Sequence, residues 1–153
     1  MARRSGYNTC MSMQESVKRA FPDSGTPDAG QLPALTLAYI GDTVYDLYVR
    51  AFLIHTRNMQ PHALHTAAIR YVCAAGQASA ARRLEGLLSD EERAVFRRGR
   101  NAHSGTMPKN ATGADYHAAS ALEALIGYLF MKGKDERIAE LMRAAWEEEK
   151  HAE

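Results

Sequence analysis

Three carboxylates lie in stretches of the sequence that are otherwise apolar. Asp42 and Asp46 fall in LTLAYIGDTVYDLYVRAFLI (35–54), and Glu123 falls in SALEALIGYLF (120–130). A carboxylate within an apolar helix face is costly unless it is paired, hydrogen-bonded or bound to a cation. Carboxylates brought together from two helices favour a hard cation such as Mg²⁺, which takes oxygen ligands and often uses only one or two protein carboxylates. The pattern therefore predicts either a metal centre or buried ion pairs.

The structural alternatives are specific. Asp42 can cap a helix, and either aspartate can pair with Arg50. Glu123 follows Ser120 at capping-box spacing, although the sequence before them already has a helical pattern, and Thr112 suits a helix start better. Asp46 lies one turn after Asp42 and shares its face, so a further hypothesis gives it an outer, water-mediated contact to a cation. These residues alone leave all of these interpretations open.

A basic segment without acidic residues, RRGRNAHSGTMPKN (97–110), lies between the two apolar stretches. The chain as a whole carries a formal charge of only +1, so a local basic segment suggests an anionic partner at one face. Amide and hydroxyl groups beside arginines can position phosphates. The same residue types are also common at helix ends and in turns. The candidate phosphate contacts are Arg98, Arg100, Asn101, Ser104 and Lys109.

The elements that must position these residues have helical patterns. Leu37, Ile40, Val44, Leu47 and Ala51 follow the i, i+3, i+4 spacing of an apolar helix face. Ser89 and Glu92 form a capping box at the start of another helix, which Gly99 is expected to stop or bend. Gly76 marks a kink or a close contact within a helix over 61–88, and the last two helices cover 115–134 and 134–151. Because no stretch has a strand pattern, we expect an all-α fold.

Length and composition predict one compact domain. The chain has 153 residues, 46% of them hydrophobic and 24% charged, which is enough to bury a core. Proline, glycine and aspartate cluster at 22–33, so we expect an N-terminal arm and linker over 1–31 and the compact domain over 32–150. No run approaches the roughly 20 apolar residues of a membrane span, and no secretory signal is evident. With two distant cysteines, these features predict a reduced, cytoplasmic protein without a membrane partner.

Three blocks resemble a known family when they are taken together. YIGDTVYDLYVR (39–50) and ALEALIGYLF (121–130) look like the two signature helices of the ribonuclease III catalytic domain. FRRGRNAHSGTMPKN (96–110), between them, is similar to the compact bacterial branch called Mini-ribonuclease III, which lacks the double-stranded-RNA-binding domain. The resemblance covers about 32–133, and the blocks occur in the family's order.

The resemblance implies a ribonuclease III endonuclease-domain-like helical bundle that forms a homodimer. It implies Mg²⁺-dependent cleavage of double-stranded RNA, with precursor 23S ribosomal RNA as the substrate. Asp42 falls on the family's aspartate of the G-D step and Glu123 on the glutamate of the E-A-L-I-G motif. Both are implied catalytic residues and metal ligands. Since no separate RNA-binding domain is expected, a ribosomal protein bound to the precursor is a candidate helper that presents the RNA.

The sequence departs from the family pattern at two positions. Full-length ribonuclease III has carboxylates where this chain has Ala38 and Ser120, so only two of four acids are retained. The losses slightly favour an alternative, a non-catalytic RNA-binding or ribosome-assembly protein on the same helices. Retention of Asp42 and Glu123 favours the nuclease, because a binding module has no use for two acids near RNA phosphates. A different all-α metal phosphohydrolase is a second alternative, although such enzymes usually have more histidines and acids.

Overall fold

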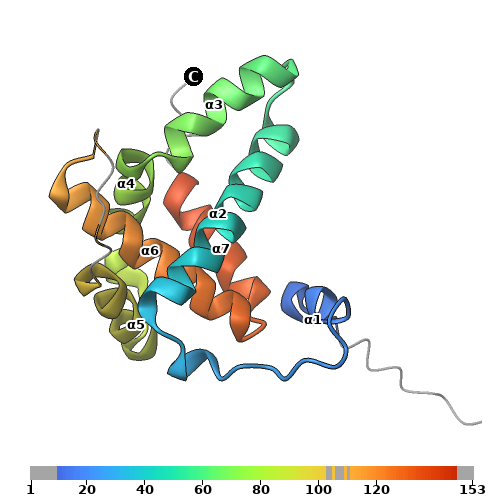
Figure 1. The fold of residues 1–153 in the computed structure, drawn as a ribbon. Helices are drawn as coiled ribbons and strands as arrows, with labels where there is room; N and C mark the ends of the chain where they lie inside the picture. Colours follow the sequence, from blue (N-terminus) through green and yellow to red (C-terminus); the bar gives the residue numbers. More distant parts are fainter. Residues whose placement is uncertain (1–9, 103–104, 106–108, 110, 148–153) are drawn as a thin grey trace, which may run out of the picture.

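The computed structural model describes residues 10–102, 105, 109 and 111–147, and in these residues the chain is helical without a strand. The predicted all-α fold is confirmed (Figure 1). The helices are α1 (Met13–Lys18), η1 (Ala29–Gln31), α2 (Ala34–Thr56), α3 (Pro61–Val72), α4 (Ala74–Leu84), η2 (Glu85–Leu87), α5 (Asp90–Asn101), α6 (Gly113–Met131) and α7 (Asp135–Trp146). None of the helices within these residues has the length and apolar content that crossing a membrane requires.

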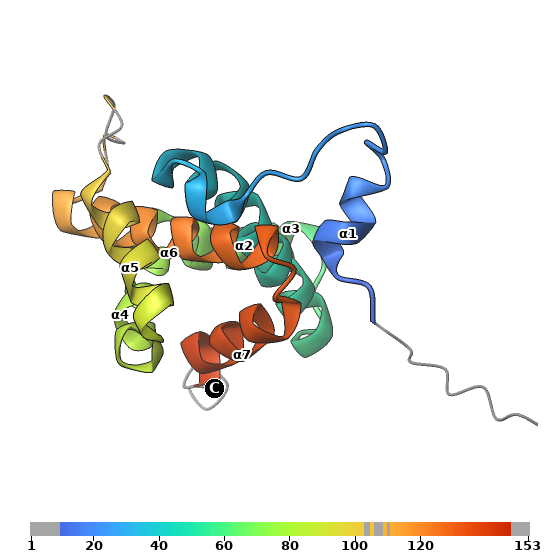
Figure 2. The same cartoon turned by 90° about the horizontal axis from the view of Figure 1, so that it is seen from below.

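Helix α6 forms the centre of the bundle, and α2, α4, α5 and α7 pack around it (Figures 1 and 2). Four of its large apolar side chains are completely buried: Leu122, Leu125, Ile126 and Leu129. Most of the other residues between Ala118 and Phe130 are buried as well. A helix that is apolar on all sides is a core helix rather than a surface helix. Glu123 is therefore carried by the most enclosed element of the molecule.

Two glycines bring the backbones of α2 and α6 into direct contact. A Cβ atom on Gly41 would lie 1.7 Å from the carbonyl oxygen of Glu123, and one on Gly127 would lie 1.9 Å from the carbonyl oxygen of Leu37. Any side chain at these positions would push the helices apart. The close contact sets Asp42, the residue after Gly41, beside Glu123.

The buried face of α2 differs from the predicted one. Leu37 and Val44 are buried as expected, but Leu47 is 52% exposed, and Tyr45 and Val49 take its place in the core. The buried face rotates along this helix because its second half leaves α6 and packs against aromatic residues of α3 and α7. There the ring of Trp146 lies 5.0 to 5.8 Å, centroid to centroid, from the rings of Tyr45, Phe52 and Tyr71.

The prediction of one helix over 61–88 was wrong. Cys73 adopts an extended conformation with φ −67° and ψ 160°, so that it ends α3 and caps α4. Gly76 makes a close contact, because a Cβ atom there would lie 2.1 Å from the carbonyl oxygen of Arg70. Gly99 also differs from the prediction, since α5 continues to Asn101 and this glycine lets α5 approach Ser120 and Ala124 of α6.

Candidate active site

The structure brings Asp42 of α2 and Glu123 of α6 together. Their side chains are within hydrogen-bonding reach of each other, and the negative charge of Asp42 acts directly on Glu123. Asp42 is exposed, whereas Glu123 is half-buried between the helices. In this pair, the carboxylate of Asp42 faces the solvent, and the side chain of Glu123 extends toward Asp42 from the core helix α6.

The environment of Glu123 opposes its negative charge. Burial raises the pKa of this carboxyl to about 8, and the charge of Asp42 acts in the same direction. Near neutral pH, Glu123 therefore retains a proton when no cation is nearby. A site in which two acids are forced together without a counter-charge suits a positively charged ligand.

Gln77 completes this group, although it was not among the residues predicted from the sequence. This residue of α4 is only 2% exposed, and its Nε2 donates a hydrogen bond to Oδ1 of Asp42 at 3.2 Å. A second hydrogen bond, from the Gln77 side chain to Glu123, lowers the pKa of that carboxyl against the effect of burial. One signal was present: Gln77 shares a helix face with Ala81 and Leu84, both completely buried, so a polar residue occupies a core position.

The residues at this site fit a divalent cation that binds through oxygen. Two carboxylates and a neighbouring amide form the group, and the exposed side of Asp42 leaves space for water or a phosphate. In the described part of the chain, no group of three or more His, Cys, Asp or Glu could hold a metal ion. The protein thus offers two acidic ligands, a number that Mg²⁺ commonly uses with water and substrate phosphates completing its shell. The two departures from the family pattern, Ala38 and Ser120, are buried beside the site.

Asp46 has its own partner. Its carboxylate accepts hydrogen bonds from Nε of Arg50 at 3.0 and 3.1 Å, one turn further along α2. This is the ion pair that the sequence offered as the structural alternative. The structure gives no contact between Asp46 and Glu123.

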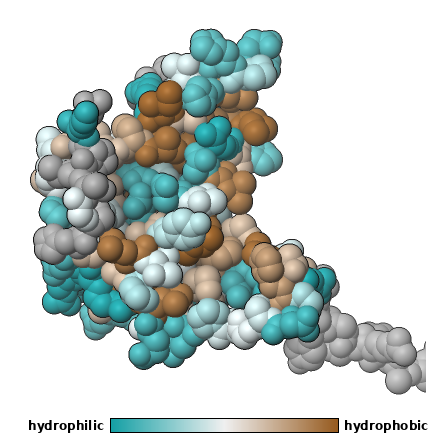
Figure 3. Space-filling view, in the orientation of Figure 1, coloured by the Kyte–Doolittle hydropathy of each residue, from teal (hydrophilic) through white to brown (hydrophobic). Residues whose placement is uncertain are grey.

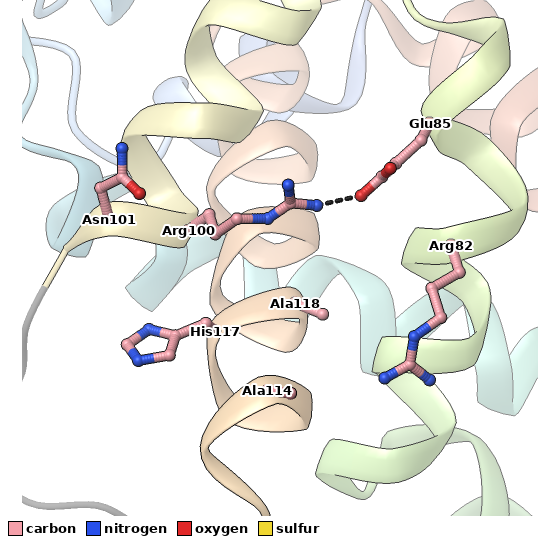
Figure 4. A pocket seen from close by; sticks show the side chains of 7 residues that line it. All are labelled: Arg82, Glu85, Arg100, Asn101, Ala114, His117 and Ala118. Carbon is pink, nitrogen blue, oxygen red and sulfur yellow. Dashed lines mark hydrogen bonds and ion pairs between the residues drawn. The ribbon is translucent and has the colours of Figure 1, made fainter.

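The predicted phosphate contacts separate into different places. Arg100 pairs with Glu85 across a pocket of about 530 Å³, where its guanidinium also lies 5.1 Å from the centre of the Phe96 ring (Figure 4). Asn101 lines this pocket and also an open groove of about 490 Å³ along α5, which Arg97 and Arg98 line as well. Lys109 is exposed, and Ser104 lies outside the described residues.

The fold is that of a ribonuclease III domain, and comparison with known proteins shows this class. Residues 35–134 match the family model "Ribonuclease III domain". Over 121 residues, the chain is 47% identical to Mini-ribonuclease 3 of Brevibacillus brevis, covering 79% of this chain and 90% of that protein. It is 44% identical to Mini-ribonuclease 3 of Symbiobacterium thermophilum, covering 74% and 88%. The chain therefore belongs to the Mini-ribonuclease 3 family, a group of ribonuclease III-type endoribonucleases.

A solved structure has the same fold. The crystal structure of a protein from Fusobacterium nucleatum superposes with a TM-score of 0.71 at 25% sequence identity, covering 78% of this chain and 95% of that one. The matched family region, 35–134, contains Asp42, Gln77 and Glu123, whereas α1 lies before it. The predicted family and fold class are thus confirmed.

Proposed function

We propose that this endoribonuclease cleaves double-stranded RNA in a Mg²⁺-dependent reaction and acts in the cytoplasm on precursor 23S ribosomal RNA. The observation that carries the proposal is the adjacency of Asp42 and Glu123. Among the residues that the structure describes, the two acids contact each other and the Gln77 amide, and no basic side chain pairs with them. An acid pair that served stability alone would be expected to contact an arginine or lysine. The choice of RNA substrate rests on the resemblance to the family.

Asp42 and Glu123 would hold the cation through their carboxylate oxygens. A bound divalent cation supplies positive charge that polarises a scissile phosphate and favours attack by water. Glu123 must first lose its proton, and Asp42, which is exposed, presents its free side to the substrate. The close contact of Gly41 with the backbone of Glu123 keeps the two acids at a fixed spacing while the RNA binds.

Helix α5 offers a surface for the RNA backbone. Arg97 and Arg98 are exposed, and neither forms an ion pair with any residue that the structure describes. Duplex RNA is read mainly through its phosphates and shape, which suits such a basic groove. Helix α5 packs against α6 at Ser120 and Ala124, next to Glu123, so that the groove and the acid pair flank the same part of α6. Arg100 would join these contacts by exchanging Glu85 for a phosphate, and Lys109 is exposed for the same role.

The proposed enzyme is a homodimer, because each strand of a duplex needs its own cut and a two-fold dimer presents one acid pair to each strand. Helix α2 has large apolar side chains on its outer face: Leu35, Tyr39, Leu47 and Ile54 are 40 to 82% exposed. In the space-filling view, apolar side chains lie over α2 and along α3 (Figure 3). An exposed apolar face of this kind is typical of an interface. Val44, on the same helix, is buried and does not belong to this face.

A cleavage assay with three substrates tests the proposal. Long duplex RNA, single-stranded RNA and duplex DNA are each incubated with the protein in Mg²⁺ or in a chelator. We expect cleavage of duplex RNA alone, which the chelator and the Asp42→Asn variant abolish, whereas Asp23→Asn, an exposed change in the N-terminal linker, cleaves normally. Binding of duplex RNA without cleavage would instead support the RNA-binding or ribosome-assembly alternative.

The ribosomal substrate needs a separate comparison. We expect a duplex from the ends of precursor 23S ribosomal RNA to be cut at one position, and an unrelated duplex of equal length to be cut more slowly. Addition of the ribosomal protein bound to that precursor region is expected to raise the rate. Equal rates for the two duplexes, with or without that protein, would contradict the assignment of substrate.

A further inference from the structure

Gln77 is a buried polar residue whose side chain reaches both acids of the proposed centre. It lies on α4, is 2% exposed, and contacts Asp42 of α2 and Glu123 of α6 through its side chain. A side-chain amide carries two N–H donors on one nitrogen, so that a single group can serve two carboxylates. Three helices thus meet at one amide.

The orientation of this amide follows from its neighbours. With Nε2 toward the acids, Gln77 donates to Oδ1 of Asp42 at 3.2 Å. The reverse orientation would set the amide oxygen against Oδ1 of Asp42, which is an acceptor, and would leave a buried donor without a partner. Gln77 is therefore a donor to the acid pair.

The position of Gln77 is fixed by the break between α3 and α4. The Gln77 backbone N–H donates to the carbonyl of Cys73 at 2.9 Å, in the first turn of α4. Gly76, the preceding residue, packs directly on the backbone of Arg70 and Tyr71. Ala78 and Ala81, on the same helix, are completely buried, so α4 cannot shift without disturbing the core.

A neutral donor is the residue type that suits two acids awaiting a cation. Arginine or lysine at this place would neutralise the pair and compete with the cation. An apolar residue would leave the carboxylates without a fixed orientation. An amide orients both groups and leaves their charge available.

We propose that Gln77 is a positioning residue of the endoribonuclease, which holds the carboxylates of Asp42 and Glu123 in the arrangement that binds a divalent cation. This inference rests on the proposed cation-dependent function. It gives α4 a role in the proposed metal centre, in addition to the sequence motifs of α2 and α6 that carry the two acids.

The test is the affinity of the RNA-free protein for Mn²⁺, measured by titration calorimetry. Gln77→Met keeps the length of the side chain and removes its amide, and we expect it to weaken Mn²⁺ binding about 10-fold. Cleavage by this variant should fall at low Mn²⁺ and return to the wild-type rate at saturating Mn²⁺. Gln60→Met, the same change at an exposed residue without a side-chain cap hydrogen bond, should bind Mn²⁺ as the wild type does.

The outcomes separate the two proposals. If the wild type neither binds Mn²⁺ nor cleaves duplex RNA, the proposed function fails. If the wild type does both and Gln77→Met binds Mn²⁺ with unchanged affinity, only the role of Gln77 is overturned; a lower rate at saturating Mn²⁺ with unchanged affinity has the same meaning. Should Gln77→Met not fold, Gln77→Asn decides, because its shorter amide cannot span both acids and should weaken binding several-fold; equal affinity there overturns the inference.

Discussion

Glu92, which is buried, and Glu123, which is half-buried, have opposite environments. Glu92 accepts hydrogen bonds from Arg137 at 2.8 and 2.9 Å, and this contact lowers the pKa of its carboxyl. Glu123 faces Asp42 instead, and its pKa is raised to about 8. The first arrangement stabilises the charged acid, and the second destabilises it. The contrast supports the proposed chemical role of Glu123, whereas the environment of Glu92 is that of a structural ion pair.

This contrast predicts a pH-dependent stability difference. In Glu123 the folded-state pKa lies above the unfolded value, so the native protein loses stability as pH rises from about 4.5 to about 8. Glu123→Gln has no such loss. We expect the metal-free variant to match the wild type near pH 4 and to exceed its free energy of unfolding by about 2 to 4 kcal/mol at pH 9, measured by urea denaturation in a chelator.

Glu92→Gln is the matched control. In the wild type, the folded-state pKa of Glu92 is lowered, so the charged carboxylate stabilises the native state at pH values above the unfolded-state pKa. This variant should lose about 2 kcal/mol at neutral pH, and the difference should shrink as the pH falls below about 4. A difference between Glu123→Gln and the wild type that does not change with pH would contradict the account of Glu123.

At the residue scale, the sequence indicated the acids but not their partner. Asp42 and Glu123 each interrupt an apolar pattern, so their positions could be selected without coordinates. Gln77 follows alanine and glycine in a helix that also carries arginines, where one more polar residue is unremarkable. Only the packing of α4 on the core shows that this amide points inward.

At the scale of the helices, the contact between α2 and α6 is the feature that builds the site. Gly41 and Gly127 let the two backbones touch, and this contact sets Asp42 beside Glu123. A glycine within a helix normally costs about 1 kcal/mol relative to alanine. Here the lost propensity is offset by the packing of two long helices at their closest point.

Gly41→Ala should therefore damage both the fold and the site. The new Cβ atom would lie 1.7 Å from a backbone oxygen of Glu123, so the helices must separate. We expect a loss of about 3 kcal/mol in the free energy of unfolding and the loss of Mn²⁺ binding. Gly86→Ala, where nothing lies within 4 Å of the added atom, should change stability by less than about 1 kcal/mol. Similar effects from the two variants would refute the proposed contact.

Helix starts were predictable, whereas helix interruptions were not. The capping boxes at Ser12 and Ser89 and the cap at Thr112 form as their spacing predicts. These signals are local, so they can be detected in sequence. The break at Cys73 has no local signal, because it depends on distant contacts such as the hydrogen bond that Tyr45 donates to the carbonyl of Tyr71 at 3.2 Å.

At the scale of the whole molecule, the outer face of α2 would connect the site with the proposed dimer. Asp42 lies on the same helix as the exposed Tyr39 and Leu47, which are 82% and 52% exposed. A second copy on this face would place the two acid pairs on either side of one interface. Helical periodicity alone predicted that Leu47 is buried. It could not show that the buried face of α2 rotates along the helix, which leaves Leu47 exposed.

Leu47→Glu should weaken the dimer without unfolding the subunit. The side chain is exposed in the subunit, so a charge there leaves the core intact, but at an interface it would be desolvated. We expect a dimer dissociation constant about 100-fold higher by sedimentation analysis, with a parallel loss of duplex cleavage. Leu87→Glu, which alters a 53% exposed leucine outside α2, should remain dimeric. A wild type that sediments as a monomer while it cleaves duplex RNA would contradict the proposed assembly.

The position of a bound cation tests the central claim most directly. A crystal of the protein soaked in Mn²⁺ and measured at the manganese absorption edge would show each ion as an anomalous difference peak. The account predicts a peak between the carboxylates of Asp42 and Glu123, with the Gln77 amide beside them, and no peak there in Glu123→Gln. Manganese bound elsewhere, with those two carboxylates left free, would contradict it.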